Sequence, residues 1–154
     1  MEILKKFFHT DDSTTHLIIR VVLGFVIFLH GAQKLFGWFG GHGFSGTMGF
    51  FTEKMGFPAV IAFLVIIGES FGALGLITGF LTRLSAAGIA CIMLGAIAMR
   101  HWNHGIFMNW GGNQAGEGFE YHLLALGLAI PLILFGGGTC SLDQIFERKI
   151  HKMT

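Results

Sequence analysis

Two ionisable side chains inside the hydrophobic part of this sequence, Glu69 and His30, could carry acid–base chemistry. An ionisable group costs roughly 2.5–3.5 kcal/mol to insert at bilayer depth, so groups retained there are functional candidates. A buried carboxyl group needs a basic partner or takes up a proton, and imidazole exchanges protons near neutral pH. The two side chains could therefore relay protons to a quinone or another small apolar substrate, because quinone reduction consumes protons as well as electrons.

The first apolar stretch offers three basic partners for Glu69, each at a different depth. At a rise of 1.5 Å per residue, the axial gap to Glu69 is about 8 Å for His30, about 11 Å for Arg20 and about 14 Å for Lys34. We expect His30 or Arg20 to meet the carboxyl group and Lys34 to extend toward the outer surface. Arg20 and Lys34 would give electrostatic support. The alternative to a relay is a structural pair that fixes the register of two helices.

Histidine and methionine gather in a second region, which includes MRHWNHGIFM at residues 99–108. Histidine, methionine and carboxylate near one surface could bind copper or another transition metal. The first candidates for ligands are His101, His104 and Glu120, with His122 next. The alternative is a hydrogen-bonded loop at headgroup level, which the spacing favours because it matches no strong metal motif.

The elements that must position these residues are membrane helices. The 154 residues are 53% hydrophobic and 12% charged, with a mean hydropathy of +0.66, whereas a soluble domain carries about 25% charged residues. The composition excludes a soluble cytoplasmic domain, and a net charge of +1 leaves no basic face for nucleic acid. A span needs about 20 mainly apolar residues. Four stretches qualify or nearly do, at about residues 17–37, 58–80, 84–100 and 121–137.

Two amphipathic segments accompany these spans. Apolar residues repeat at helical spacing from Phe44 to Met55, which predicts a short helix at the outer interface. Ser141 could cap a second short helix after the last span. Glycines at small-xxx-small spacing in the second span predict close helix packing, at Gly68, Gly72, Gly75 and Gly79. We therefore expect one all-α domain over residues 1–154, an integral membrane four-helix bundle with a short amphipathic helix on its outer face.

The distribution of Lys and Arg predicts the orientation of the bundle. Six of them lie on the side of the two termini and three at or beyond the other side, which places both termini in the cytoplasm. The six are Lys5, Lys6, Arg83, Arg148, Lys149 and Lys152, and the three are Lys34, Lys54 and Arg100. Four short helices enclose little volume, so we expect a homo-oligomer or a partner redox subunit.

Three motifs resemble signatures of the DoxX family. They are HGAQKLFGW at residues 30–38, GESFGALGLITG at 68–79 with Arg83 following, and GGGTCSLD at 136–143, where the family usually has proline in place of Gly137. The resemblance covers about residues 17–143. It implies a four-helix inner-membrane protein of a family named after a subunit of an archaeal thiosulfate:quinone oxidoreductase system. Relatives are often labelled oxidoreductases, and some are linked to quinone, catechol or thiol stress.

These observations favour a small protein of the bacterial inner membrane, a subunit of a quinone-linked oxidoreductase or of a redox or detoxification system. The alternative is a non-catalytic transporter of a small solute or metal, or a membrane scaffold. Cys91 and Cys140 are expected at different depths and form no Cys-x-x-Cys pair, so thiol–disulfide catalysis by this chain alone is not expected. No dinucleotide or Walker motif occurs. Electrons would therefore need a flavin or haem in a partner, or a quinone as carrier.

Overall fold

A computed structural model describes residues 7–152 of the chain, and this part contains helices and no strand. The prediction of an all-α membrane bundle is confirmed. Three helical segments are long and apolar enough to cross a membrane, Thr14–Phe36, Ala59–Thr78 and Thr82–His104, and a shorter apolar helix covers Glu120–Phe135. The labelled helices are α2 (Thr14–Phe36), α3 (Gly43–Gly49), α4 (Ala59–Ile67), α5 (Ala73–Thr78), α6 (Thr82–Ala96), α7 (Glu120–Phe135) and α8 (Leu142–Lys152).

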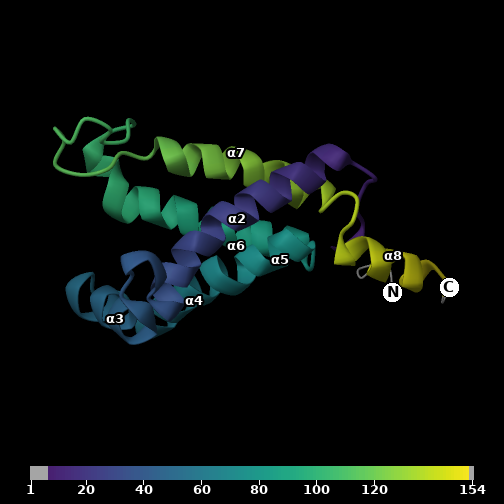
Figure 1. The fold of residues 1–154 in the computed structure, drawn as a ribbon, viewed down its shortest axis with the longest axis horizontal. Helices are drawn as coiled ribbons and strands as arrows, with labels where there is room; N and C mark the ends of the chain where they lie inside the picture. Colours follow the sequence, from purple (N-terminus) through teal and green to yellow (C-terminus); the bar gives the residue numbers. More distant parts are fainter. Residues whose placement is uncertain (1–6, 153–154) are drawn as a thin grey trace.

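The bundle has two distinct ends (Figure 1). Both ends of the described chain lie at one of them, together with the turn between α5 and α6, and we call this the terminal end. The connections at residues 37–58 and 101–119 lie at the other, which we call the histidine end. Lys5 and Lys6, which contribute to the predicted orientation, lie outside the described residues.

The first two long segments approach each other backbone to backbone. A Cβ atom on Gly31 of α2 would lie 2.5 Å from the carbonyl oxygen of Glu69, and one on Gly24 would lie 2.9 Å from that of Ala73. In the predicted glycine row, an added Cβ atom would lie 2.7, 2.5 and 2.4 Å from its nearest neighbour at Gly68, Gly75 and Gly79, and 4.0 Å at Gly72. Close packing is therefore present at three of the four predicted glycines, and the glycines of α2, which the spacing argument did not single out, add the backbone-to-backbone approach.

Both amphipathic segments form helices. The first is α3, which a π-turn at Phe50–Lys54 extends. The second is α8, where the Ser141 hydroxyl accepts a hydrogen bond from the Gln144 amide at 3.2 Å, as an N-cap does. The Asp143 carboxylate accepts hydrogen bonds from the amides of Leu81 and Thr82, both at 2.8 Å. One carboxylate thus joins the beginning of α8 to the beginning of α6.

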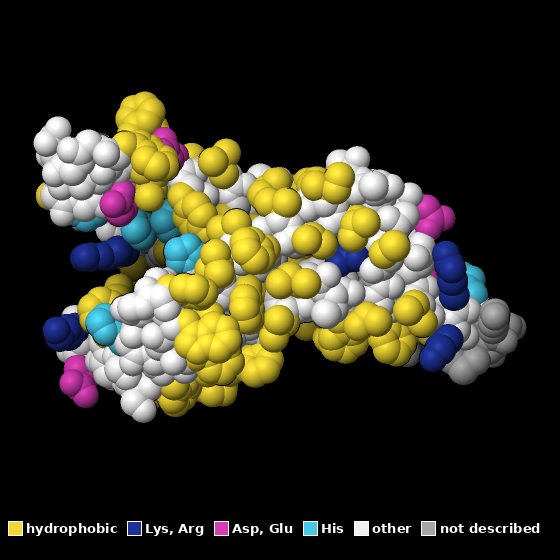
Figure 2. Space-filling model, viewed as in Figure 1, with side chains coloured by type: hydrophobic (Ala, Val, Ile, Leu, Met, Phe, Trp, Pro, Cys, Tyr) yellow, Lys and Arg dark blue, Asp and Glu magenta, His cyan; other side chains and the backbone are white. Residues whose placement is uncertain are grey.

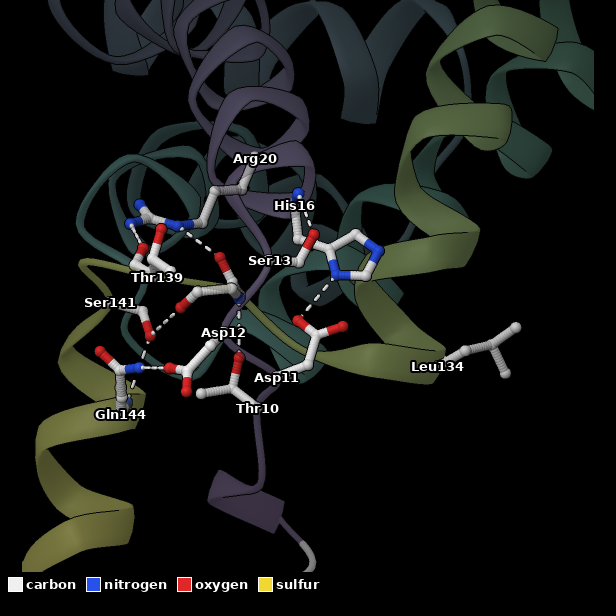
Figure 3. A network of polar contacts seen from close by, with 12 residues as sticks. Thr10, Asp11, Asp12, Ser13, His16, Arg20, Leu134, Thr139, Ser141 and Gln144 are labelled. Carbon is white, nitrogen blue, oxygen red and sulfur yellow. Dashed lines mark hydrogen bonds and ion pairs between the residues drawn. The ribbon is translucent and has the colours of Figure 1, made fainter.

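Arg20 is buried at the terminal end, where it lies beside Thr139 and not beside Glu69 (Figure 3 shows its surroundings). Its guanidinium makes five hydrogen bonds to backbone oxygens at 2.6–3.2 Å. The acceptors are the carbonyl groups of Leu76, Ile77, Gly137, Thr139 and Cys140. The expectation that Arg20 could reach Glu69 is wrong because the last turn of α5 and the loop before α8 bring five carbonyl groups within hydrogen-bonding distance of its guanidinium. Arg20 therefore fastens this end of the bundle.

Candidate functional site

The partner of Glu69 is Lys34. Its Nζ atom donates to Oε2 of Glu69 at 2.5 Å, and the two side chains are 24% and 7% exposed, respectively. The expectation that Lys34 extends outward and that His30 or Arg20 pairs with Glu69 is therefore wrong. The axial arithmetic measured depth from the expected ends of the spans, whereas the structure sets Gly31 beside Glu69, so that Lys34 lies about one turn further along α2 and within reach of the carboxyl group. The long lysine side chain then turns inward to the Glu69 carboxylate, whose negative charge offsets its own.

A π-turn places Glu69 on the surface that faces α2. The turn covers Gly68–Gly72, between α4 and α5, and both Glu69 and Ser70 are buried in it. A π-turn inserts one extra residue into a helix, so consecutive residues can both face a neighbouring helix. The Ser70 hydroxyl donates to the carbonyl oxygen of Gly31 at 3.3 Å. The flanking glycines are visible in the sequence, but the extra residue in the turn is not.

Lys34 also lines a pocket of about 310 Å³ at the histidine end. This volume is at the lower end of the range for sites that bind small molecules. The walls come from the end of α2, the turn at residues 40–42, and α3 with its π-turn. They consist of Gln33, Lys34, Gly40, Gly41, His42, Thr47, Phe50 and Phe51. Two aromatic rings beside four polar side chains suit a small ring compound with polar substituents.

On the face shown in Figure 2, hydrophobic side chains cover the middle of the bundle, and histidine and basic side chains border a notch at the histidine end. His30 is one of the exposed residues of α2. It lies within electrostatic range of both Lys34 and Glu69. Its ring packs against Tyr121, with 5.7 Å between ring centroids. His30 is therefore a neighbour of the ion pair and not its hydrogen-bonding partner.

The four candidate metal ligands do not form one site. Within residues 7–152, no group of three or more His, Cys, Asp or Glu side chains could hold a metal ion. Oε1 of Glu120 accepts a hydrogen bond from the Trp110 indole at 3.0 Å, and the His104 ring lies beside Gly116. The third long helix ends in a π-turn at Ile97–His101 and a 3-10 turn. These turns interrupt the regular helical spacing that would place His101 and His104 on one face of a continuous helix.

His101 and His122 do come together, with 4.3 Å between ring centroids. The neighbour of His122 in the sequence, Tyr121, was not singled out, although it is the one tyrosine in the sequence. The Tyr121 hydroxyl and Nδ1 of His122 are both buried and have no hydrogen-bond partner among the residues that the structure describes. Buried polar atoms of this kind usually have a partner, such as ordered water, so they mark a place where a polar molecule can bind.

The fold and the ion pair define a helical membrane protein with a buried charged site. Residues 15–102, more than half of the chain, match the sequence profile described as DoxX, so the chain belongs to the DoxX family. The expected resemblance is thereby confirmed. The chain is also similar to "Putative oxidoreductase CatD" of Bacillus subtilis (strain 168), with 31% identity over 81 residues. That alignment covers 53% of this chain and 55% of the relative, so it spans about half the length of each. No solved structure matches the chain.

Proposed function

We propose that this chain is the membrane subunit of a quinone-linked oxidoreductase, in which the pocket beside Lys34 binds the quinone ring. The observation that carries the proposal is that Lys34 belongs both to the pocket wall and to the buried ion pair with Glu69. A proton donor and its counter-charge are thus placed at the edge of a cavity with two aromatic side chains. The relative from Bacillus subtilis carries the name "Putative oxidoreductase CatD", which supports the same class of activity here.

The ion pair suits the proton chemistry of quinone reduction. Each quinone takes up two electrons and two protons, and two O–H bonds form. We assign the electrons to a partner redox subunit. The Lys34 ammonium can donate a hydrogen bond to a quinone oxygen and stabilise the negative charge that develops on it. Glu69 holds the ammonium in place and accepts or returns a proton, and His30 supports this exchange from the adjacent turn of α2.

We further propose a single domain over residues 1–154, located in the bacterial inner membrane, with the terminal end in the cytoplasm. The basic residues Arg83, Arg148 and Lys149 lie at the terminal end, which supports this orientation. The pocket then opens toward the outer side. A homo-oligomer or a partner subunit would cover part of the exposed apolar flanks, and lipid would cover the rest.

The experiment compares Glu69→Gln with Glu53→Gln. Glu53 is exposed, in the π-turn after α3, and provides a carboxyl group at the same end of the bundle. Membranes that contain equal amounts of each variant are assayed for quinone-dependent turnover, and binding of decylubiquinone is followed by quenching of tryptophan fluorescence. We expect Glu69→Gln to abolish turnover and Glu53→Gln to retain it. Unchanged turnover in Glu69→Gln would contradict the proposal, and solute uptake without redox turnover would favour a transporter instead.

A further inference from the structure

Four ring side chains form a row that begins beside the ion pair. His30 of α2 packs against Tyr121 of α7, with 5.7 Å between centroids. Tyr121 packs against His122 at 5.4 Å, and His122 packs against His101 at 4.3 Å. The row therefore connects α2, the first turn of α7 and the π-turn after α6. Every member of this row can take up and release a proton.

The two ends of the row have different surroundings. At one end, His30 lies within electrostatic range of both Lys34 and Glu69, and Tyr121 lies within range of Glu69. At the other end, Nδ1 of His101 lies 2.8 Å from the carbonyl oxygen of Glu117, an exposed residue of the loop before α7. The row thus runs from a buried charged pair to a loop in contact with solvent.

The middle of the row contains two polar atoms without a protein partner. The Tyr121 hydroxyl and Nδ1 of His122 are buried, and the structure gives neither a hydrogen bond among the residues it describes. His122 as a whole is only 7% exposed. Leaving a buried polar group unpaired costs about 1–3 kcal/mol, which ordered water bound to these atoms would remove. A tyrosine hydroxyl, a neutral imidazole and a water molecule can each both donate and accept a hydrogen bond, so a proton can pass along them.

We infer that His101, His122, Tyr121 and His30 form a proton-transfer path from the surface near Glu117 to the Lys34–Glu69 pair. The path deepens the proposed function and depends on the role of Glu69 as a proton-exchanging group. A carbonyl group can only accept, so Nδ1 of His101 carries the hydrogen and Nε2 takes the proton from solvent. Each transfer moves one proton and no electron. Every group returns to its starting state when it passes the proton on.

The test measures how fast Glu69 takes up a proton. The full chain is reconstituted in nanodiscs and subjected to a downward pH jump, and the carboxyl C=O band is followed by infrared spectroscopy. The band that is absent in Glu69→Gln identifies Glu69. The variants are Tyr121→Phe, which removes only the hydroxyl, and His122→Gln, which removes the imidazole. If Tyr121→Phe does not fold, His122→Gln still measures the effect of interrupting the row. His104→Gln is the control, because His104 lies at the same end of the bundle and outside the row.

We expect Tyr121→Phe and His122→Gln to slow protonation of Glu69 by at least about tenfold, since positioned proton-transfer groups contribute about 10²–10⁴ in rate. The final extent of protonation and the thermal stability should not change, and His104→Gln should retain the wild-type rate. A purely structural row would change stability and not this rate. Wild-type rates in both variants would overturn the path, as would a wild-type carboxyl band that does not respond to pH.

Decylubiquinone binding on the same preparations separates this inference from the proposed function. If the quinone binds and both variants protonate Glu69 at the wild-type rate, the path is wrong and the proposed function stands. If no quinone binds and the variants slow protonation, the path stands and the quinone site is wrong.

Discussion

Substitution of Gly31 by alanine gives the sharpest test of how the site is held together. The added Cβ atom would lie 2.5 Å from the carbonyl oxygen of Glu69, 2.7 Å from its carbonyl carbon and 2.8 Å from Cα of Ser70. All three are backbone atoms, so no side-chain rotation relieves the overlap and α2 must move away from the π-turn. The displacement would also lengthen the hydrogen bond from Ser70 to the Gly31 carbonyl, which is 3.3 Å.

The size of the effect follows from a matched control. Gly88 of α6 has no atom within 4 Å of an added Cβ, so Gly88→Ala tests helix propensity alone. That gain is about 0.5–1 kcal/mol in both variants, and it cancels in their difference. Overpacking of a close interface costs about 1–3 kcal/mol. We therefore expect the free energy of unfolding of Gly31→Ala to be lower than that of Gly88→Ala by about 1–3 kcal/mol.

The assay is unfolding of the purified protein in mixed micelles by titration with dodecyl sulfate, followed by circular dichroism. Quinone binding is measured on the folded variants, because a displaced π-turn moves Glu69 away from Lys34. We expect weaker binding in Gly31→Ala and unchanged binding in Gly88→Ala. Equal stability and equal binding in the two variants would refute the tight approach of α2 to the π-turn.

Three further predictions concern the terminal end. Arg20→Lys keeps the charge but has three N–H donors in place of five, so at least two hydrogen bonds are lost, at about 1.5–3 kcal/mol each. We therefore expect the free energy of unfolding to fall by about 3–6 kcal/mol, and unfolding at the wild-type dodecyl sulfate fraction would mean that the hydrogen bonds of Arg20 do not stabilise this end of the bundle. Asp143→Asn offers one oxygen to the amides of Leu81 and Thr82, so the same titration should show a loss of about 1–3 kcal/mol, whereas no change would mean that these bonds contribute nothing. Cys140 is exposed at the terminal end; in Cys91→Ser protein an impermeant maleimide should label it in inverted vesicles and not in right-side-out vesicles, and the opposite pattern would reverse the proposed orientation.

The sequence determines most of the helical scaffold. Hydrophobic runs of about 20 residues predict the long segments, and the helical spacing from Phe44 to Met55 predicts α3. The Ser141 cap at the beginning of α8 follows from local chemistry alone. Burial of Glu69 also follows from the sequence, because the carboxyl group lies in the middle of an apolar run. These features depend on interactions between residues that are close in the chain, which a single sequence displays.

The tertiary structure decides which groups meet. A rise of 1.5 Å per residue gives the depth of Lys34, His30 and Arg20 along one helix, but it contains neither the register of that helix against its neighbour nor the π-turn around Glu69. Arg20 binds carbonyl groups more than 50 residues away in the chain, and Tyr121 reaches His30 only because α7 packs against α2. Packing between residues that are distant in the chain determines the partner of a buried charge, because the charged group binds the complementary group that the fold brings within hydrogen-bonding distance.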